Sequence, residues 1–399
     1  MLVKTELAQT PSVKRLVKAW SQLYTLNFQS IALTQDPSFY TKLTEAISLE
    51  GRVKTAAKLN ERIIELRCEM ASVKTSALYA YMQNVMHLQE VKRIADASFK
   101  IYTQLVDLYQ QNLLNAAFVP AAEPLISALR PEPKPLKLAI ASNIDRLSSA
   151  LEPVLLEFQQ EHSQLKDWRT LGFLTTQINF CNQWITDKLT PIEQVLLSPY
   201  LTFIEEQVAH PWQRVCAAAA RHPADSLVLA LAEQMIPMSG EIADAAYSAL
   251  TRLLPNHRSR RGMLTNPGVT HSCIRDLKMF QVYLWLCVLE ESLVPVEEEL
   301  VRLCVMVLPS VGVQWEMTEL WTQVLTDEVI RRIEPSRRKH VLPYVLPYTS
   351  GIEDAFLAAR IQLDTQLSRQ VAESSGDSNR SLRASLKTIP TQQSYFKAV

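Results

Sequence analysis

The chain has 399 residues, of which 47% are hydrophobic, 21% are charged and only 8 are glycine. This length exceeds what one hydrophobic core usually serves, so two or three domains are expected, and the scarcity of glycine favours an all-α fold over hairpin-rich β folds. Because 41 basic residues balance 41 acidic ones, the net charge gives no general attraction to nucleic acid or to an anionic membrane.

Residues 1–118 show the pattern of a helical bundle or a long helical hairpin. Between residues 41 and 117 there is no proline and one glycine, and apolar residues recur at steps of three and four. We expect the resulting stripe to face the core, with a partner-binding surface as the alternative. The stripe consists of Ile63, Leu66, Met70, Val73, Ala77, Tyr81, Val85 and Leu88.

Two further segments follow in chain order. Residues 119–137 contain five prolines, which predict a linker because proline lacks a donor N–H and disfavours helix in the residue before it. Helical periodicity resumes over residues 138–186, and we assign these helices to the N-terminal domain.

A boundary near Asp187 precedes a second helical domain, over residues 187–365. Thr190 and Ser198 each stand before a proline and are suited to cap helices that begin there. Residues 366–399 are rich in small polar residues, which predicts a mostly disordered tail. The helices expected after the boundary lie near residues 199–209, 212–220, 225–235, 241–254, 272–289, 296–307 and 316–333.

The cysteines and the apolar runs indicate a soluble protein of the cytoplasm. None of the six cysteines forms a CxxC pair, which suits reduced thiols. The N-terminus lacks the apolar segment of a secretory signal. The longest apolar run, residues 282–289, is too short to cross a bilayer of about 30 Å, so no membrane insertion is expected.

The sequence carries no recognisable catalytic motif. HExxH, GxGxxG, Walker and GxSxG patterns are absent, and the seven histidines are scattered. We therefore predict no enzyme, no catalytic residue, no metal site and no nucleic-acid partner. Glu206 and His210, four residues apart, are interpreted as a surface ion pair. The basic runs within residues 257–261 and 331–339 are interpreted as solvated surface.

One segment departs from this background, at the start of the apolar helix expected over residues 272–289. The polar start of a buried helix lies at the rim of a core, where pockets form. Cys273 and Asp276, three residues apart, project to one face, and the side chain of Arg275 can reach the same volume. A thiol, a carboxylate and a guanidinium suit a linear tetrapyrrole, which offers an unsaturated carbon, pyrrole N–H groups and carboxylates. A buried structural cysteine beside surface charges is the alternative.

This segment resembles a known family. The run Cys273-Ile274-Arg275-Asp276-Leu277, followed by Pro295, Glu297-Glu298, Ser310 and Gly312, is similar to the chromophore helix and the next helix of the phycobiliproteins, without a gap from residue 273 to 312. The resemblance covers about residues 187–348 and implies a globin-like helical domain. Its weaker part rests on Leu197-Ser198-Pro199, Arg214 and Ala217 to Ala220.

The resemblance also implies roles for three side chains. In that family the residue at Cys273 forms a thioether to a bilin, the Asp at 276 holds the inner pyrrole N–H groups, and the Arg at 275 meets a propionate. Met279-Phe280 and Val282 replace a tyrosine pair and an arginine that the family commonly has. These departures and the long N-terminal helical region indicate a fused or accessory member rather than an ordinary light-harvesting subunit.

Three functions stay open. The first is a bilin-binding protein in or near the phycobilisome antenna, at the thylakoid surface. The second is a bilin-free globin-like scaffold or adaptor that docks on antenna proteins. The third is an accessory factor in bilin synthesis or attachment. A haem-binding globin with His271 as ligand is a further alternative.

Overall fold

The computed structural model describes residues 10–26, 38–82, 87–110, 138–139, 144–165 and 169–387. Within them the chain is almost entirely helical, with two short two-stranded ladders, and this confirms the predicted all-α class. None of the helices in these ranges combines the length and apolar character that a membrane span requires. The globin-like arrangement of residues 187–365 stays a prediction, and the predicted linker at 119–137 lies outside the described residues.

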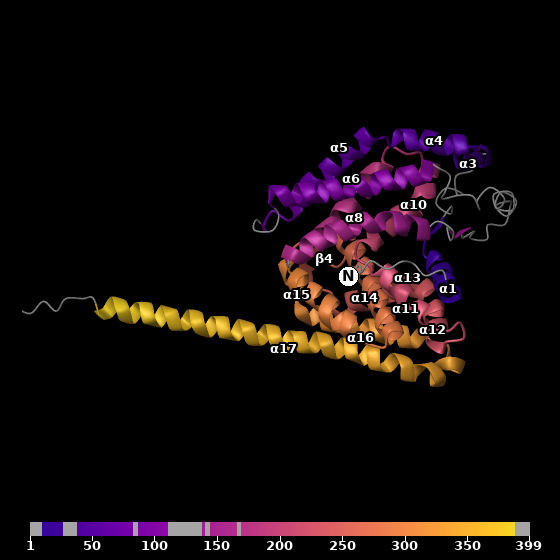
Figure 1. Ribbon diagram of the computed structural model, residues 1–399. Helices are drawn as coiled ribbons and strands as arrows, with labels where there is room; N and C mark the ends of the chain where they lie inside the picture. Colours follow the sequence, from indigo (N-terminus) through magenta and orange to yellow (C-terminus); the bar gives the residue numbers. More distant parts are fainter. Residues whose placement is uncertain are drawn as a thin grey trace, which may run out of the picture.

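The helices from α3 to α8 form the upper part of the molecule in Figure 1. Within it α5 packs against both α6 and α9. The side-chain amide oxygen of Asn60 accepts a hydrogen bond from the backbone N–H of Ile63 at 3.2 Å, which fixes the start of α5. The elements are α3 (Phe39–Ile47), α4 (Leu49–Lys58), α5 (Glu61–Leu78), α6 (Leu88–Gln110), α8 (Ile144–Leu165) and α9 (Arg169–Thr186).

The second half gathers around α14, which is buried on nearly every side from Met279 to Leu289. Thr190 caps α10 as predicted, in a capping box with Glu193, and α10 continues through Pro199 instead of restarting there. The helices are α10 (Pro191–Gln207), α11 (Trp212–Ala220), α12 (Leu227–Met235), α13 (Ser239–Leu253), α14 (Pro267–Glu290), α15 (Val301–Ser310), α16 (Trp315–Arg332) and α17 (Pro335–Lys387), with a short 3-10 helix η1 (Ile236–Met238) and a short π-helix η2 (Val296–Leu300).

The four short strands form two antiparallel ladders, and one of them shapes the site described below. Strand β1 (Thr25–Leu26) pairs with β2 (Leu138–Ala139), and β3 (Arg258–Ser259) pairs with β4 (Gly262–Met263). Gly262 has φ +126°, which only glycine adopts without strain and which lets the β3–β4 hairpin close. The backbone N–H of Arg260 donates to the carbonyl of Val311 at 3.0 Å, so the hairpin is held against the end of α15.

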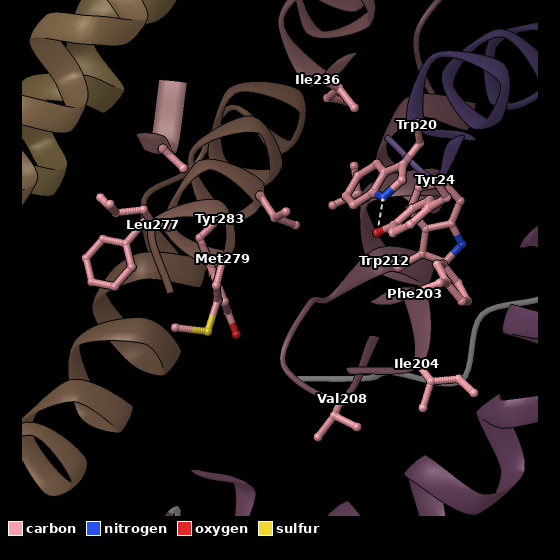
Figure 2. Packing of buried hydrophobic residues seen from close by; sticks show 14 of the residues in the cluster. Trp20, Tyr24, Phe203, Ile204, Val208, Trp212, Ile236, Leu277, Met279 and Tyr283 are labelled. Carbon is pink, nitrogen blue, oxygen red and sulfur yellow. Dashed lines mark hydrogen bonds between the residues drawn. The ribbon is translucent and has the colours of Figure 1, made fainter. Parts of the chain in front are cut away.

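The first helix, α1 (Pro11–Ser21), packs against α11 and α12. The rings of Trp20 and Trp212 meet edge to face with centroids 4.1 Å apart, as Figure 2 shows. Ser12 donates to the carbonyl of His222 at 2.8 Å. The prediction grouped residues 1–118 as one bundle. In the structure α1 packs with the second half instead, because its contacts with α11 and α12 bury Trp20 there.

Most of the apolar stripe predicted to line the core of the first half faces outward instead, although Ile63 is half-buried and Val85 lies outside the described residues. Val73 is 69% exposed, and Leu66 and Met70 are exposed beside it. The buried face of α5 carries Ile64, together with small or polar residues such as Cys68, Ala71 and Thr75. Small side chains let α9 approach closely, and buried polar ones are satisfied there, since the hydroxyl of Thr75 donates to Gln177 at 3.0 Å.

The predicted disordered tail, residues 366–399, is helical through Lys387 in the structure, and residues 388–399 lie outside the described ones. Figure 1 shows the end of α17 (yellow) running beyond the rest of the molecule as a single helix. Each residue added to an existing helix gains one backbone hydrogen bond, so a helix anchored by packing up to Ala359 propagates into a polar segment that would not begin one.

Candidate functional site: a pocket at the start of α14

A pocket lies between the two halves of the molecule, where α14 begins. The centre of a water molecule can move through about 110 Å³ of it, against roughly 10–15 Å³ needed to hold one water. The second half supplies most of the wall from α14, α15, α16 and the β3–β4 hairpin, and the first half supplies Tyr79 next to α5 and Gly172 and Thr176 on α9. Apolar side chains such as Phe280 and Met317 dominate the wall.

The cap of α14 aims the predicted site residues at this pocket. The side-chain oxygen of Asn266 accepts from the backbone N–H groups of Gly268 and Val269 at 2.9 and 3.3 Å, with Pro267 in the first turn. The helix therefore starts early enough to place Cys273 and Asp276, one turn apart, on the pocket wall, and Arg275 lines the pocket as well. All three residues that the sequence singles out are brought together.

The Cys273 thiol is 8% exposed. Burial raises its pKa to about 12, and the charge of Asp276 acts in the same direction, while Arg275 and Arg261 act against both. A thiol with this pKa is protonated at neutral pH, and the protonated form is a poor nucleophile. Cys273 is placed to touch a ligand, but it is not activated to attack one by the protein alone.

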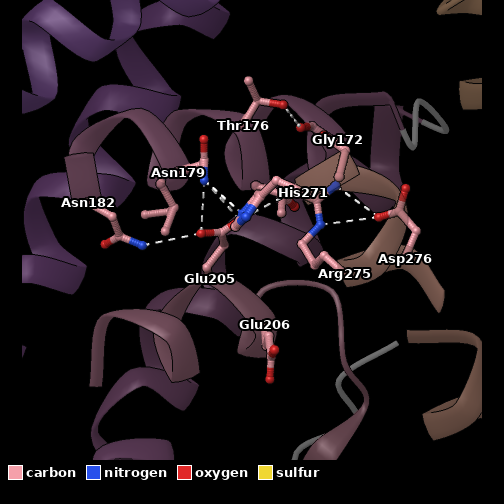
Figure 3. Close-up of polar contacts among 12 residues, drawn as sticks. Gly172, Thr176, Asn179, Asn182, Glu205, Glu206, His271, Arg275 and Asp276 are labelled. Atoms are coloured by element: carbon pink, nitrogen blue, oxygen red, sulfur yellow. Dashed lines mark hydrogen bonds and ion pairs between the residues drawn. The ribbon is translucent and has the colours of Figure 1, made fainter. Parts of the chain in front are cut away.

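Arg275 is held by acids of the protein itself, as Figure 3 shows. Its Nε and Nη2 atoms donate to Oδ1 of Asp276 at 3.2 and 2.9 Å, and its Nη1 lies 3.6 Å from Oε1 of Glu205. Burial disfavours the charged guanidinium, but Asp276 and Glu205 together raise the pKa of Arg275 above its ordinary value. Arg275 thus serves first as the bridge between α14 and α10.

Glu205, on α10, is buried at the centre of a polar cluster between the two halves, and the side chain of His271 at its edge is exposed (Figure 3). His271 Nε2 donates to its Oε1 at 2.6 Å, and the amides of Asn179 and Asn182 reach its oxygens at 3.2–3.3 Å. Burial alone would raise the pKa of Glu205, but His271, Arg275 and Asn179 hold it below the ordinary value. These partners therefore favour the ionised form of Glu205. His271 acts here as a donor to an acid.

The basic run at 257–261, interpreted as solvated surface, forms the β3–β4 hairpin at the rim of the pocket. Arg261 lines the pocket and donates through Nη1 to the hydroxyl of Ser272 at 2.9 Å. The guanidinium of Arg260 lies over the ring of Tyr81, 4.3 Å from its centroid, a cation–π contact that joins the hairpin to the first half. The interpretation as solvated surface is therefore corrected for Arg261, which is half-buried, and for His257, which is buried, whereas Arg260 is exposed.

Three polar atoms of the pocket wall have no hydrogen-bond partner among the described residues. They are Nε2 of His257, Oγ1 of Thr318 and Nε1 of Trp321. Sequence reasoning missed all three, along with Tyr79 and Thr176. The available signal was modest: Thr318 and Trp321 stand one turn apart on the same face of α16.

A second cluster surrounds Glu206 and corrects another interpretation. Glu206 and His210 are both buried, and Lys278 rather than His210 is the ion partner of Glu206, at 2.7 Å. Tyr24 donates to Glu206 at 2.5 Å. Burial lowers the pKa of His210 to about 4 against the pull of Glu206, so the imidazole is neutral. The pair is not a surface ion pair, because α1 and its following turn cover it.

The arrangement as a whole can hold a small molecule. It offers an apolar slot, a carboxylate, a guanidinium at the rim and unpartnered donors, but no nucleophile activated by a neighbouring base. In the part of the chain that the structure describes, no three His, Cys, Asp or Glu side chains gather as a metal site requires. Comparison with family models, with curated proteins and with solved structures gives no match.

Proposed function

We propose that this chain binds a linear tetrapyrrole in the pocket at the start of α14, as an accessory protein of a light-harvesting antenna. The observation that carries the proposal is the convergence of Cys273, Arg275 and Asp276 on one pocket with apolar walls. The resemblance of residues 273–312 to phycobiliproteins supplies the ligand class, and the pocket supplies a place where such a ligand can be bound.

The size of the pocket limits how much of the pigment it takes. Ligand pockets usually measure roughly 300–1,000 Å³, and the space inside this one is about 110 Å³. One end of the open chain of pyrrole rings fits between Phe280 and Met317, and the rest lies toward the hairpin. The carboxylate of Asp276 accepts pyrrole N–H groups through Oδ2, since Oδ1 already bonds to Arg275.

Arg261 is better suited than Arg275 to bind a propionate. Arg275 already bridges two acids, whereas Arg261 donates to the hydroxyl of Ser272 and forms no ion pair among the described residues, although Asp276 lines the same pocket. A guanidinium at the rim binds a carboxylate with two parallel hydrogen bonds. The binding is non-covalent in the protein alone, because the raised pKa of Cys273 keeps its thiol protonated.

The test is titration of the purified protein with biliverdin, followed by visible absorption. We expect a shifted and sharpened absorption band on binding, and a Kd about tenfold weaker for Asp276→Asn, which loses the charge that accepts the N–H groups. Asp244→Asn, on the exposed face of α13, is the matched control and keeps the parent affinity. A parent protein whose titration leaves the biliverdin spectrum unchanged contradicts the proposal and favours the bilin-free scaffold.

A further inference from the structure

Two buried cysteines meet at the contact between α5 and α9, in the first half of the molecule. The sulfur of Cys68, on α5, lies 3.9 Å from the sulfur of Cys181, on α9. The two residues are 113 positions apart in the sequence, and both are almost fully buried, free thiols. Neither lines the pocket at the start of α14, so this thiol pair is separate from the proposed bilin site.

Hydrogen bonds across the same contact hold the two helices in place beside the thiols. The side-chain amide of Gln177, one turn before Cys181 on α9, donates to the backbone carbonyl of Cys68 at 2.7 Å. The hydroxyl of Thr75, further along α5, donates to the side-chain oxygen of Gln177 at 3.0 Å. Both Thr75 and Gln177 are fully buried. The approach of the two sulfur atoms is therefore a consequence of how the helices pack.

The two sulfur atoms are near enough to form a disulfide after a small movement. The sulfur atoms of a disulfide are about 2.0 Å apart, so the thiols must approach each other by about 1.9 Å. Each sulfur is one rotatable bond away from its backbone, and rotation about the two Cα–Cβ bonds moves the sulfurs while the helices stay in place. A weak S–H···S contact between thiols that stay reduced is the alternative.

We infer that Cys68 and Cys181 form a reversible disulfide that links α5 to α9 when the protein meets a peroxide. Hydrogen peroxide is close to water in size, so a local opening of the helix contact admits it. The thiolate of one cysteine attacks a peroxide oxygen, which gives a sulfenic acid and releases hydroxide that is protonated to water. The second sulfur then attacks the sulfenic sulfur and a second water leaves with its proton. Overall the two thiols lose two protons and two electrons, one S–S bond forms, and the peroxide is reduced to two waters.

Burial governs how fast this disulfide forms. Burial and the neighbouring Cys68 raise the pKa of Cys181 well above its ordinary value, so little thiolate exists at neutral pH and the reaction with peroxide is slow. Once formed, the disulfide joins residues far apart in the chain, which restricts the unfolded state and stabilises the folded one. The linked helices also border the pocket, where the hydroxyls of Tyr79, next to α5, and Thr176, on α9, lie 2.9 Å apart.

The experiment treats the reduced protein with hydrogen peroxide and removes the excess with catalase. The remaining thiols are alkylated with N-ethylmaleimide in urea, and a non-reducing digest is analysed by mass spectrometry. We expect a crosslinked peptide pair that contains Cys68 and Cys181 and is lighter by two hydrogen atoms than the two reduced peptides together. The melting temperature should lie several degrees above that of the reduced protein. Dithiothreitol should reverse both changes.

Two variants separate this pair from oxidation elsewhere in the chain. Cys181→Ala keeps a small apolar side chain, and it should lose both the crosslinked peptide and the rise in melting temperature. Cys287→Ala is the matched control, because Cys287 is equally buried and burial also raises the pKa of its thiol. It should keep both changes. If Cys181→Ala does not fold, the reversal by dithiothreitol in the parent protein still decides the inference.

Three results overturn the inference, and all of them leave the proposed bilin function intact. The first is that Cys68 and Cys181 both stay reduced in peroxide. The second is a sulfinic acid at either residue without the crosslinked peptide, which would show that the other sulfur cannot reach it. The third is a crosslinked peptide with a melting temperature at or below that of the reduced protein, because such a disulfide would not fit the folded state.

Discussion

The two sides of α14 differ in whether their buried polar groups have partners. On the side that faces α10 and α1, Lys278 pairs with Glu206, and Arg275 with Glu205, at the boundaries between elements. On the pocket side, Thr318 and Trp321 of α16 keep buried donors with no partner among the described residues. A protein gains stability where buried polar groups are paired, and each one left unpaired costs about 1–3 kcal/mol.

On the paired side, the adjacent carboxylates of Glu205 and Glu206 bind different neighbouring elements. Glu205 bonds to Asn179 of the first half and to His271 at the start of α14 (Figure 3). Glu206 bonds to Tyr24 and Lys278 instead. Successive helical residues lie about 100° apart, so one helix position after another faces a different neighbour. α10 thereby connects α9, α14 and the turn after α1, and it fixes the frame in which the pocket opens.

Breaking the paired side should produce the largest effect. Lys278→Met keeps the length of the side chain but leaves the Glu206 carboxylate buried with no cation, and we expect a loss of about 3–5 kcal/mol in the free energy of unfolding. Urea denaturation followed by circular dichroism measures it. Lys54→Met is the matched control, because Lys54 pairs with Glu50 at 3.0 Å in an exposed position, where such pairs contribute about 0–1 kcal/mol.

Equal stabilities of these two variants would show that the paired side is not what holds α1 and α10 to α14. The comparison between the two sides of α14 would then rest on geometry alone. If Lys278→Met were destabilised but still bound biliverdin after correction for the unfolded fraction, the comparison would be strengthened. The ion pairs would then contribute to stability without contributing to binding in the pocket.

The next test uses the pH dependence of stability. The pKa of His210 is about 4 in the folded protein because of burial, and an unfolded histidine has a pKa near 6.5. The unfolded state therefore binds more protons between these values, so stability is present above pH 6.5 and is lost as pH falls toward 4. This residue alone should account for about 2 kcal/mol of loss between pH 7 and pH 5.

Urea denaturation at several pH values measures this slope, and His210→Gln should remove most of it. The exposed His340 gives the control variant His340→Gln, which should keep the parent slope. The lowered pKa values of Glu205 and Glu206 act only below about pH 4.5, because their unfolded carboxyl groups titrate there. If His210→Gln kept the parent's dependence of unfolding free energy on pH, the buried imidazole would not be its source. Water would then reach His210 in the folded protein.

The site residues on α14 could be predicted from the sequence because the three-residue spacing of Cys273 and Asp276 places them on one face of any helix. The sequence analysis missed the start of that helix, which begins at Pro267 after the Asn266 cap and not near residue 272.

The other wall could not be predicted in this way. Tyr79, Thr176 and Trp321 are each separated from the next by about 100 residues or more in the sequence. Only the packing of the two halves brings them together.

The failure on α5 has a different cause. Apolar periodicity identifies a face, but it does not say which face is buried when the opposite one carries residues like Cys68, Ala71 and Thr75. Close packing against α9 favours small side chains there, and the buried amide of Gln177 donates to the carbonyl of Cys68 at 2.7 Å. Polar residues that satisfy one another are compatible with a core, and hydrophobicity alone misses them.

The smallest expected effect concerns Cys273, at the rim between the two sides. Asp276 adds to the raised pKa of the thiol, so Asp276→Asn should lower that pKa, increase the thiolate fraction and speed alkylation by iodoacetamide at pH 8 a few-fold. Peptide mass mapping separates Cys273 from the five other buried cysteines. Cys287 serves as the internal reference, because burial raises its pKa and Asp276 is not among the causes. If Asp276→Asn left the rate at Cys273 unchanged relative to Cys287, burial alone would control the thiol. In that case only a bound ligand that displaces the carboxylate or opens the pocket could activate Cys273 for covalent attachment.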